Sequence, residues 1–250
     1  MKQMIIILAL LLCGSITVQA QRQTNYYVIL RDNSKVYGTK LSATNDGRVS
    51  VHDDRGGKQT FSRTRIRAAV SPKPAAVMDA EDLVSRKQYD RAFPKLDAAF
   101  NEYRWIGWGA YICNLRGHCH LKKNAIADAE AALEEGRKYP ANSKTRTQLL
   151  KSLVEVYLLQ EGKTEKAEKI LRKMKPNSPE ASTFVFNTRG KVLAAKGKKD
   201  MAVLSYLKTI MLYPNDPNTR EAYKEVIALL REMKDNRADD FDKELRRRFN

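Results

Sequence analysis

The side chains that could hold a metal ion cluster in one short run. Gly117, His118, Cys119 and His120 follow one another, and Cys113 lies just before them. The surrounding pattern predicts a helix, where residues two apart point about 200° apart, so the two histidines cannot grip one ion together. Zinc sites use CxxC or HxxxH spacings, and neither occurs here. We therefore expect no metal site.

The remaining polar residues do not form a catalytic pattern either. His52 falls in a predicted strand, and carboxylates such as Glu134 and Glu135 lie among other charged residues, as on a solvated surface. The glycines stand singly at turns, so no phosphate-cradling loop is formed, and no strand–Ser–helix nucleophile elbow is found. We expect a protein that is not an enzyme and that uses no cofactor.

The charge of the chain is its most unusual bulk property. The sequence has 250 residues, of which 30% are charged and 42% apolar, with a net charge of +17. The length allows one or two domains with a buried core. So large a positive charge favours anionic partners, among them nucleic acids, phospholipid head groups, acidic polysaccharides and acidic proteins.

The first twenty residues have the three parts of a secretory signal. Lys2 supplies the positive start, residues 4–12 form an apolar run, and Val18–Gln19–Ala20 places a small residue at the cut. We expect export to the periplasm or the medium, with cleavage after Ala20, and this argues against a nucleic-acid partner. Cys13 follows a leucine run, so a lipid anchor at Cys13 is the alternative.

The cysteines of the exported chain are not expected to form a disulfide. Cys113 and Cys119 are six residues apart on one predicted helix, a rise of about 9 Å. A disulfide needs Cα atoms closer than roughly 7 Å. Two buried free thiols are expected, and apolar packing must hold the fold.

Residues 21–70 are predicted to form a small β domain. Short alternating runs are separated by Gly- and Asn-containing turn clusters, and the runs cover residues 26–30, 35–41, 48–52, 58–61 and 65–70. In strand count and turn placement the layout resembles SH3-like or Sm-like barrels, which implies a five-strand barrel. So small a domain should pack on the rest of the chain. Its surface arginines, such as Arg48 and Arg65, would form a basic face or simply protect sheet edges.

Helical periodicity begins after the Pro-rich linker at 71–74. Residues 183–217 give two apolar-periodic runs around Gly197, with Tyr213–Pro214 at the end. The order of Gly190, Gly197, Ala202, the aromatic Tyr206 and Pro214 resembles the tetratricopeptide repeat (TPR), a pair of antiparallel helices.

Imperfect copies of this unit fill residues 75–217. The positions that match Gly190 are Ala80, Gly117 and Glu155, at spacings of 37, 38 and 35 residues. The TPR period is 34 residues. The resemblance implies an α-solenoid of about four helix pairs, and residues 218–250 are predicted to form a capping pair. The expected fold class is thus α+β, predominantly α.

The resemblance also implies a binding groove lined by the first helix of each pair. The family's groove positions, carried onto the two better copies, are Tyr111, Asn114, His118, Leu121 and Lys122, then Phe184, Asn187, Lys191, Ala194 and Ala195. The middle copy offers an apolar stripe, Leu149, Ser152, Val156 and Leu159. Steps of three and four residues place each set on one helix face.

Two functions remain open from the sequence. The first is an exported non-enzymatic scaffold that binds another envelope protein or a peptide through the groove. The alternative is a basic module that binds an anionic envelope polymer or a membrane surface. Binding by exposed charge alone should weaken steeply as salt rises, so salt dependence separates the two.

Overall fold

The computed structural model describes residues 25–174 and 178–249. The predicted signal peptide at 1–20 and Cys13 lie outside the described residues, so export and lipid anchoring stay predictions. Within those two ranges, no helix is long and apolar enough to cross a membrane.

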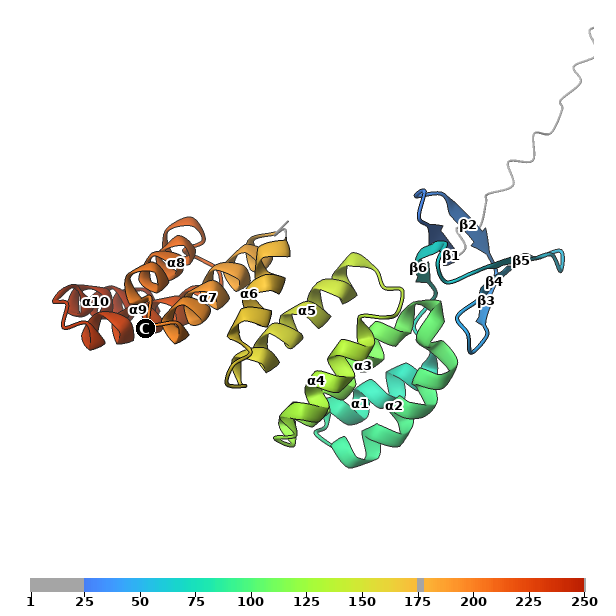
Figure 1. The fold of residues 1–250 in the computed structure, drawn as a ribbon, viewed down its shortest axis with the longest axis horizontal. Coiled ribbons are helices and arrows are strands. Elements are labelled where there is room, and N and C mark those ends of the chain that lie inside the picture. The colour runs from blue at the N-terminus through green and yellow to red at the C-terminus, as the bar shows by residue number, and fades with distance from the viewer. Residues whose placement is uncertain (1–24, 175–177, 250) are drawn as a thin grey trace, which may run out of the picture.

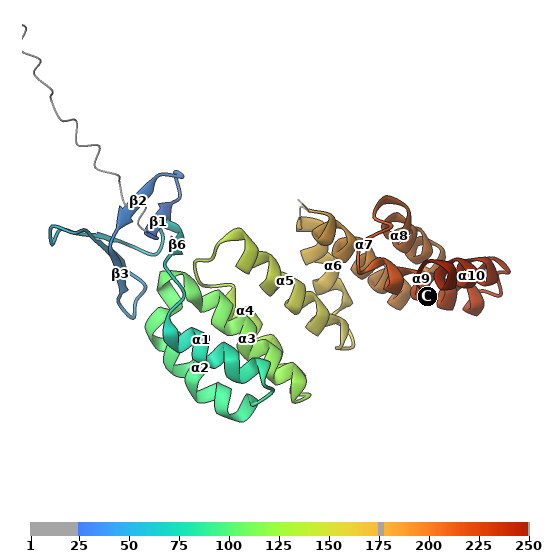
Figure 2. The same cartoon turned by 180° about the vertical axis from the view of Figure 1, so that it is seen from behind.

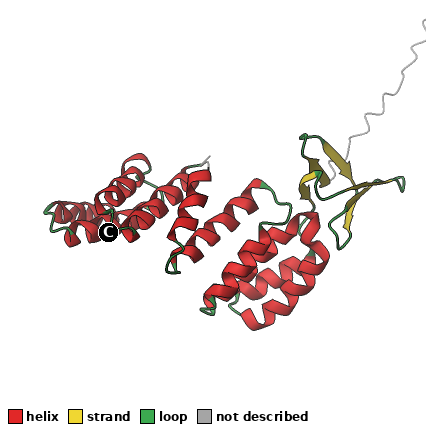
Figure 3. Cartoon of the chain, viewed as in Figure 1, coloured by secondary structure: helices red, strands yellow, loops and turns green. Residues whose placement is uncertain are grey.

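Short strands come first and helices follow, and the chain is predominantly helical (Figures 1 and 3). The strands are β1 (Tyr26–Leu30), β2 (Lys35–Gly38), β3 (Lys40–Ala43), β4 (Val49–His52), β5 (Lys58–Phe61) and β6 (Ile66–Val70). The helices are α1 (Ala75–Ser85), α2 (Tyr89–Tyr103), the irregular η1 (Arg104–Trp108), α3 (Gly109–Lys122), α4 (Ile126–Gly136), α5 (Ser143–Leu158), α6 (Thr164–Lys173), α7 (Pro179–Ala195), α8 (Lys199–Leu212), α9 (Thr219–Glu232) and α10 (Arg237–Phe249).

The β part is not the closed five-strand barrel that the sequence predicted. Its strands form two open three-stranded antiparallel sheets, ordered β2-β1-β6 and β3-β4-β5. The predicted strand at 35–41 bends between Gly38 and Lys40 and so contributes one strand to each sheet. Gly38 permits the bend because a Cβ there would lie 2.4 Å from the carbonyl oxygen of His52. Glycine is the residue used where two backbones approach this closely.

The sheets pack on the helices through η1, as the small size of the β part predicted. Trp105 is buried, and its ring lies against Gly47, which has a φ of +88°. The Trp105 Nε1 donates to the carbonyl oxygen of Asn45, and Arg104 donates to the Asn45 side chain. Trp105 thus joins the β sheets to the helical core at Tyr139, whose ring centroid lies 4.7 Å from that of Trp105.

The helices form the antiparallel pairs that the repeat pattern predicted, stacked one after another along the chain (Figures 1 and 2). The pairs are α1–α2, α3–α4, α5–α6, α7–α8 and α9–α10. Close approach within the fourth pair depends on Gly190, where a Cβ would lie 2.5 Å from the Tyr206 ring. In the second pair, a Cβ on Gly117 would lie 2.7 Å from Leu133.

The third pair departs from the register that the sequence predicted. Glu155 was matched to Gly117 and Gly190, but Glu155 is exposed, whereas Leu153 and Val154 before it are fully buried. The cause is the α5–α6 turn, which has five residues where the turns before α2, α4 and α8 have three. Counting back seven residues from Gly162, the distance from Gly197 to Gly190, therefore stops at Glu155, two residues short of the buried Leu153.

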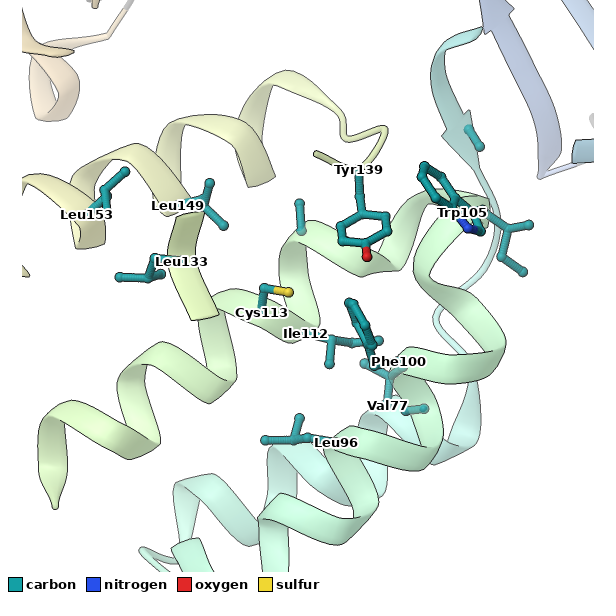
Figure 4. Packing of buried hydrophobic residues seen from close by; sticks show 14 of the residues in the cluster. Val77, Leu96, Phe100, Trp105, Ile112, Cys113, Leu133, Tyr139, Leu149 and Leu153 are labelled. Carbon is teal, nitrogen blue, oxygen red and sulfur yellow. The ribbon is translucent and has the colours of Figure 1, made fainter. Parts of the chain in front are cut away.

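Two clusters of buried apolar residues hold the structure together. The larger one runs from the β sheets through α1–α6 into α7, and Figure 4 shows its centre, where Leu96, Ile112, Leu133 and Leu149 converge from different helices. The smaller one joins α8, α9 and α10 around Tyr223. Cys113 and Cys119 are both buried and unpaired in the larger region, as predicted.

The junction between α6 and α7 depends on Glu168, and this predicts a pH effect. Lys196 and then Arg172 donate to the Glu168 carboxylate and lower its pKa from 4.5 to about 2. A carboxyl group whose pKa is lower in the folded than in the unfolded chain stabilises the fold at pH values above its unfolded-state pKa. That stabilisation is lost as the pH falls to its folded-state pKa.

Glu168→Gln should therefore lower the melting temperature at about pH 7, with the difference from wild type vanishing near pH 2. Thermal unfolding of both proteins across this range checks the result. A difference that persists at the acid end would contradict it.

Candidate partner-binding groove

The first helices of the pairs carry the stripes of side chains that the sequence predicted to line a binding groove. On α3 the stripe carries the predicted residues Tyr111, Asn114, His118 and Lys122. Tyr111 and Asn114 are half-buried, whereas His118 and Lys122 are exposed. Burial lowers the pKa of His118, and the nearby Lys122 adds to this effect. The stripe therefore runs from a sheltered end near the β sheets to an open, basic end.

The sheltered end of this stripe opens into a cavity of about 450 Å³. The cavity lies where the linker after β6, helix α1, helix α3 and the beginning of α5 meet. Its lining residues are Ala69, Val70, Ser71, Lys73, Glu81, Gly107, Trp108, Tyr111, Asn114, Asn142, Lys144, Thr145 and Gln148. Most of these side chains are polar, so the cavity suits a ligand that makes hydrogen bonds.

Three cavity residues form a hydrogen-bonded group. Lys73 and Tyr111 both donate to the Glu81 carboxylate, and the Lys73 Nζ lies 4.9 Å from the centre of the Tyr111 ring. Burial alone would raise the pKa of Glu81, but the hydrogen bonds from Lys73 and Tyr111 hold it below its usual value. Burial raises the pKa of Tyr111, so its hydroxyl keeps its proton. The group fixes Tyr111 in place at the mouth of the groove.

An aromatic wall completes the same end of the cavity. The Trp108 Nε1 donates to the Ser71 hydroxyl at 2.9 Å, and the Trp108 ring meets the Tyr111 ring edge-on, 5.6 Å between centroids. Gly107 sets this arrangement with a φ of +104°, and a Cβ there would lie 2.3 Å from the carbonyl oxygen of Ala69. Trp108 thus lines the cavity as well as packing between elements.

The cavity also has a polar acceptor without a partner. The Oδ1 atom of Asn114 is buried and has no hydrogen-bond partner within the described chain. Buried polar groups are nearly always paired, so a donor that reached this oxygen would satisfy it. Across from it, helix α5 begins at Asn142, whose side chain caps the helix by accepting from the Thr145 amide at 2.8 Å. Lys144 adds a positive charge there.

Helix α5 supplies the middle of the groove, with a surface stripe that differs from the predicted one. Leu149 and Val156 were predicted to face the groove, but both are fully buried. Ser152 is half-buried and Leu159 is exposed. The exposed positions include Glu155, whose carboxylate is partly desolvated by neighbouring atoms, which raises its pKa against the opposing effect of Lys191 and Lys151. The exposed stripe of α5 is therefore mixed and polar.

Helix α7 continues the groove with Phe184 and Lys191. Phe184 is half-buried, and the Lys151 Nζ of α5 lies 4.9 Å from its ring centre. Lys191 is exposed, as is Ala195, while Ala194 is half-buried.

Asn187 lies on the same helix but is buried, with its amide already occupied. It accepts from the Thr209 hydroxyl at 2.6 Å and donates to the Asn218 carbonyl at 3.0 Å. Contact between Asn187 and a ligand stays a prediction, and it would require these bonds to break.

Sequence reasoning missed the residues that make the cavity. Lys73, Glu81 and Lys144 come from the linker, α1 and the start of α5, far apart in the sequence. Glu81 directly follows Ala80, the residue of α1 that matches Gly117 and Gly190 in the repeat, so the repeat pattern could have indicated Glu81. Nothing in the sequence marks Lys73. Within the described ranges, no cluster of three or more potential metal ligands occurs.

Comparison with known proteins gives only structural matches. The sequence matches no protein-family profile and no curated protein sequence. Among solved structures, MamA from AMB-1 is similar with a TM-score of 0.49 and 16% identity, covering 68% of this chain and 95% of that one. YrrB, described as a TPR protein with an unusual peptide-binding site, gives a TM-score of 0.49 and 19% identity, covering 68% of this chain and 82% of that one.

Proposed function

We propose that the chain is an exported, non-enzymatic scaffold that binds another envelope protein or peptide along the groove formed by α3, α5 and α7. The observation that carries the proposal is the cavity at the start of the groove, where the buried Asn114 Oδ1 has no partner. An unpaired buried acceptor costs about 1–3 kcal/mol, which a ligand N–H would recover. The envelope location rests on the first twenty residues of the sequence.

The charges along the groove indicate the kind of segment that fits. Lys122, Lys144 and Lys191 are exposed, and none of them forms an ion pair with any described carboxylate. They lie on three successive first helices, Lys144 beside the cavity at the beginning of α5, and Lys122 and Lys191 towards the ends of α3 and α7. Acidic side chains of a bound segment would pair with these ammonium groups. The proposed ligand is therefore an acidic peptide segment of an envelope protein.

The test captures partners from a native envelope fraction with the chain starting at Gln21 as bait. A variant with Lys122→Gln, Lys144→Gln and Lys191→Gln should recover roughly tenfold less of the specific partner. All three side chains are exposed, so the fold should be unchanged.

A matched variant controls for total charge. Lys95→Gln, Lys169→Gln and Lys173→Gln removes the same charge from exposed residues on α2 and α6, the second helices of their pairs. It should retain most of the partner. Equal loss in the two variants would refute the groove and leave unspecific charge attraction as the cause.

A further inference from the structure

The sheet β3-β4-β5 has two faces of opposite character. One face is apolar, with Leu41, Val51 and Phe61 buried in the larger core. The pairing register places Lys40 opposite His52, and His52 opposite Lys58, on the other face. Residues directly opposite in neighbouring strands have Cβ atoms about 4.5–5.5 Å apart. Two ammonium groups thus flank one imidazole across all three strands.

A second row on the same face consists of hydroxyl groups. Ser42 lies opposite Ser50, and Ser50 opposite Thr60. The Ser50 and Thr60 hydroxyls are 2.8 Å apart, and the Ser42 hydroxyl is 2.8 Å from the His52 Nε2. These bonds fix the imidazole ring and the central hydroxyls in position. We call the six residues of the two rows the polar sheet face.

The lysines on this face are not neutralised by the protein itself. Neither Lys40 nor Lys58 forms an ion pair with a described carboxylate, and both are exposed. The nearby Asp53 carboxylate accepts the backbone amides of Arg55 and Gly57 at its Oδ1 atom, at 2.9 and 2.7 Å, and forms no ion pair with either lysine.

We propose that the polar sheet face binds a phosphate group. The two edge strands lie about 10 Å apart across β4, so lysines from both edges can reach one group centred over His52. Two ammonium groups carry six N–H donors between them, more than the roughly four lone-pair sites on the two oxygens of a carboxylate, whereas a phosphate presents at least three oxygens. This site is separate from the groove and takes a different ligand, so it goes beyond the scaffold function.

The experiment uses the chain starting at Gln21 with two probes. The first is soluble polyphosphate, followed by the ring and backbone NMR signals of His52. The second is vesicles of phosphatidylcholine with added phosphatidylglycerol, measured by co-sedimentation against pure phosphatidylcholine. Binding of polyphosphate alone identifies a free phosphate ligand, and binding of the anionic vesicles identifies a lipid head group. Either result supports the site if the variant below weakens it as expected.

The variant Lys40→Gln with Lys58→Gln should weaken binding of the responding probe roughly tenfold at moderate salt. The control, Lys95→Gln with Lys169→Gln, removes equal charge elsewhere and should have less than a twofold effect. Lysines on edge strands also discourage edge pairing of sheets, a role that needs no ligand. Equal effects of the two variants, or no binding of either probe, would overturn the proposal.

Discussion

Replacing Gly107 with alanine is expected to lower the free energy of unfolding by about 3 kcal/mol or more. The residue has a φ of +104°, which a side chain makes unfavourable, and the new Cβ would lie 2.3 Å from a backbone oxygen of Ala69 that cannot move alone. Because Gly107 lies between β6 and the cavity, the variant should also displace Trp108. Urea unfolding followed by tryptophan fluorescence measures both effects.

Gly56 provides the control for this prediction. It also has a positive φ, +81°, but a Cβ there would meet nothing within 4 Å. Gly56→Ala should therefore lower the free energy of unfolding by only about 1 kcal/mol, the cost of a positive φ at a residue that has a Cβ. Equal losses at Gly56 and Gly107 would show that the backbone contact at Ala69 contributes nothing.

Asn187→Ala is expected to lower the free energy of unfolding by about 2–3 kcal/mol, because it leaves the buried Thr209 hydroxyl unpaired and removes one of the two donors to the Asn218 carbonyl. The Thr209 hydroxyl is fully buried and donates only to Asn187, and the Asn218 carbonyl loses its side-chain donor at the start of α9. Unfolding by urea, followed by the helical circular dichroism signal, gives the measurement.

The matched variant is Lys191→Ala, one helical turn further along α7. Lys191 is exposed and makes no hydrogen bond or ion pair within the described residues, so the change should stay within about 0.5 kcal/mol. If Asn187→Ala also changed the free energy of unfolding by no more than about 0.5 kcal/mol, the hydrogen bonds of Asn187 would not stabilise the fold. That result would favour a ligand-binding role for Asn187.

The sequence predicted the helical pairs well because their signals are local. Apolar residues recur every three to four positions, and short turns containing Gly197 or Asn124 separate them, so each pair is visible in about thirty residues. The small residues Gly117 and Gly190 also identified where two helices touch. The same counting failed for α5, because its longer turn shifted the buried position to Leu153 and Val154.

The rest of the structure depends on contacts that no local pattern encodes. Strand pairing is non-local, so a bend after Gly38 could divide one predicted strand between two sheets without any change in periodicity. Of the predicted groove residues, only Tyr111 and Asn114 line the cavity. Their partners Lys73 and Glu81 are 38 and 30 residues from Tyr111, and only the folded chain brings them together.

The two buried cysteines determine how the fold responds to its chemical surroundings. Burial raises the pKa of Cys113 to about 12 and that of Cys119 to about 11. The thiolate is the form that reacts with oxidants, disulfides and alkylating agents, and at neutral pH almost none is present. The folded helical core therefore needs no disulfide and keeps both thiols protected from an oxidising environment.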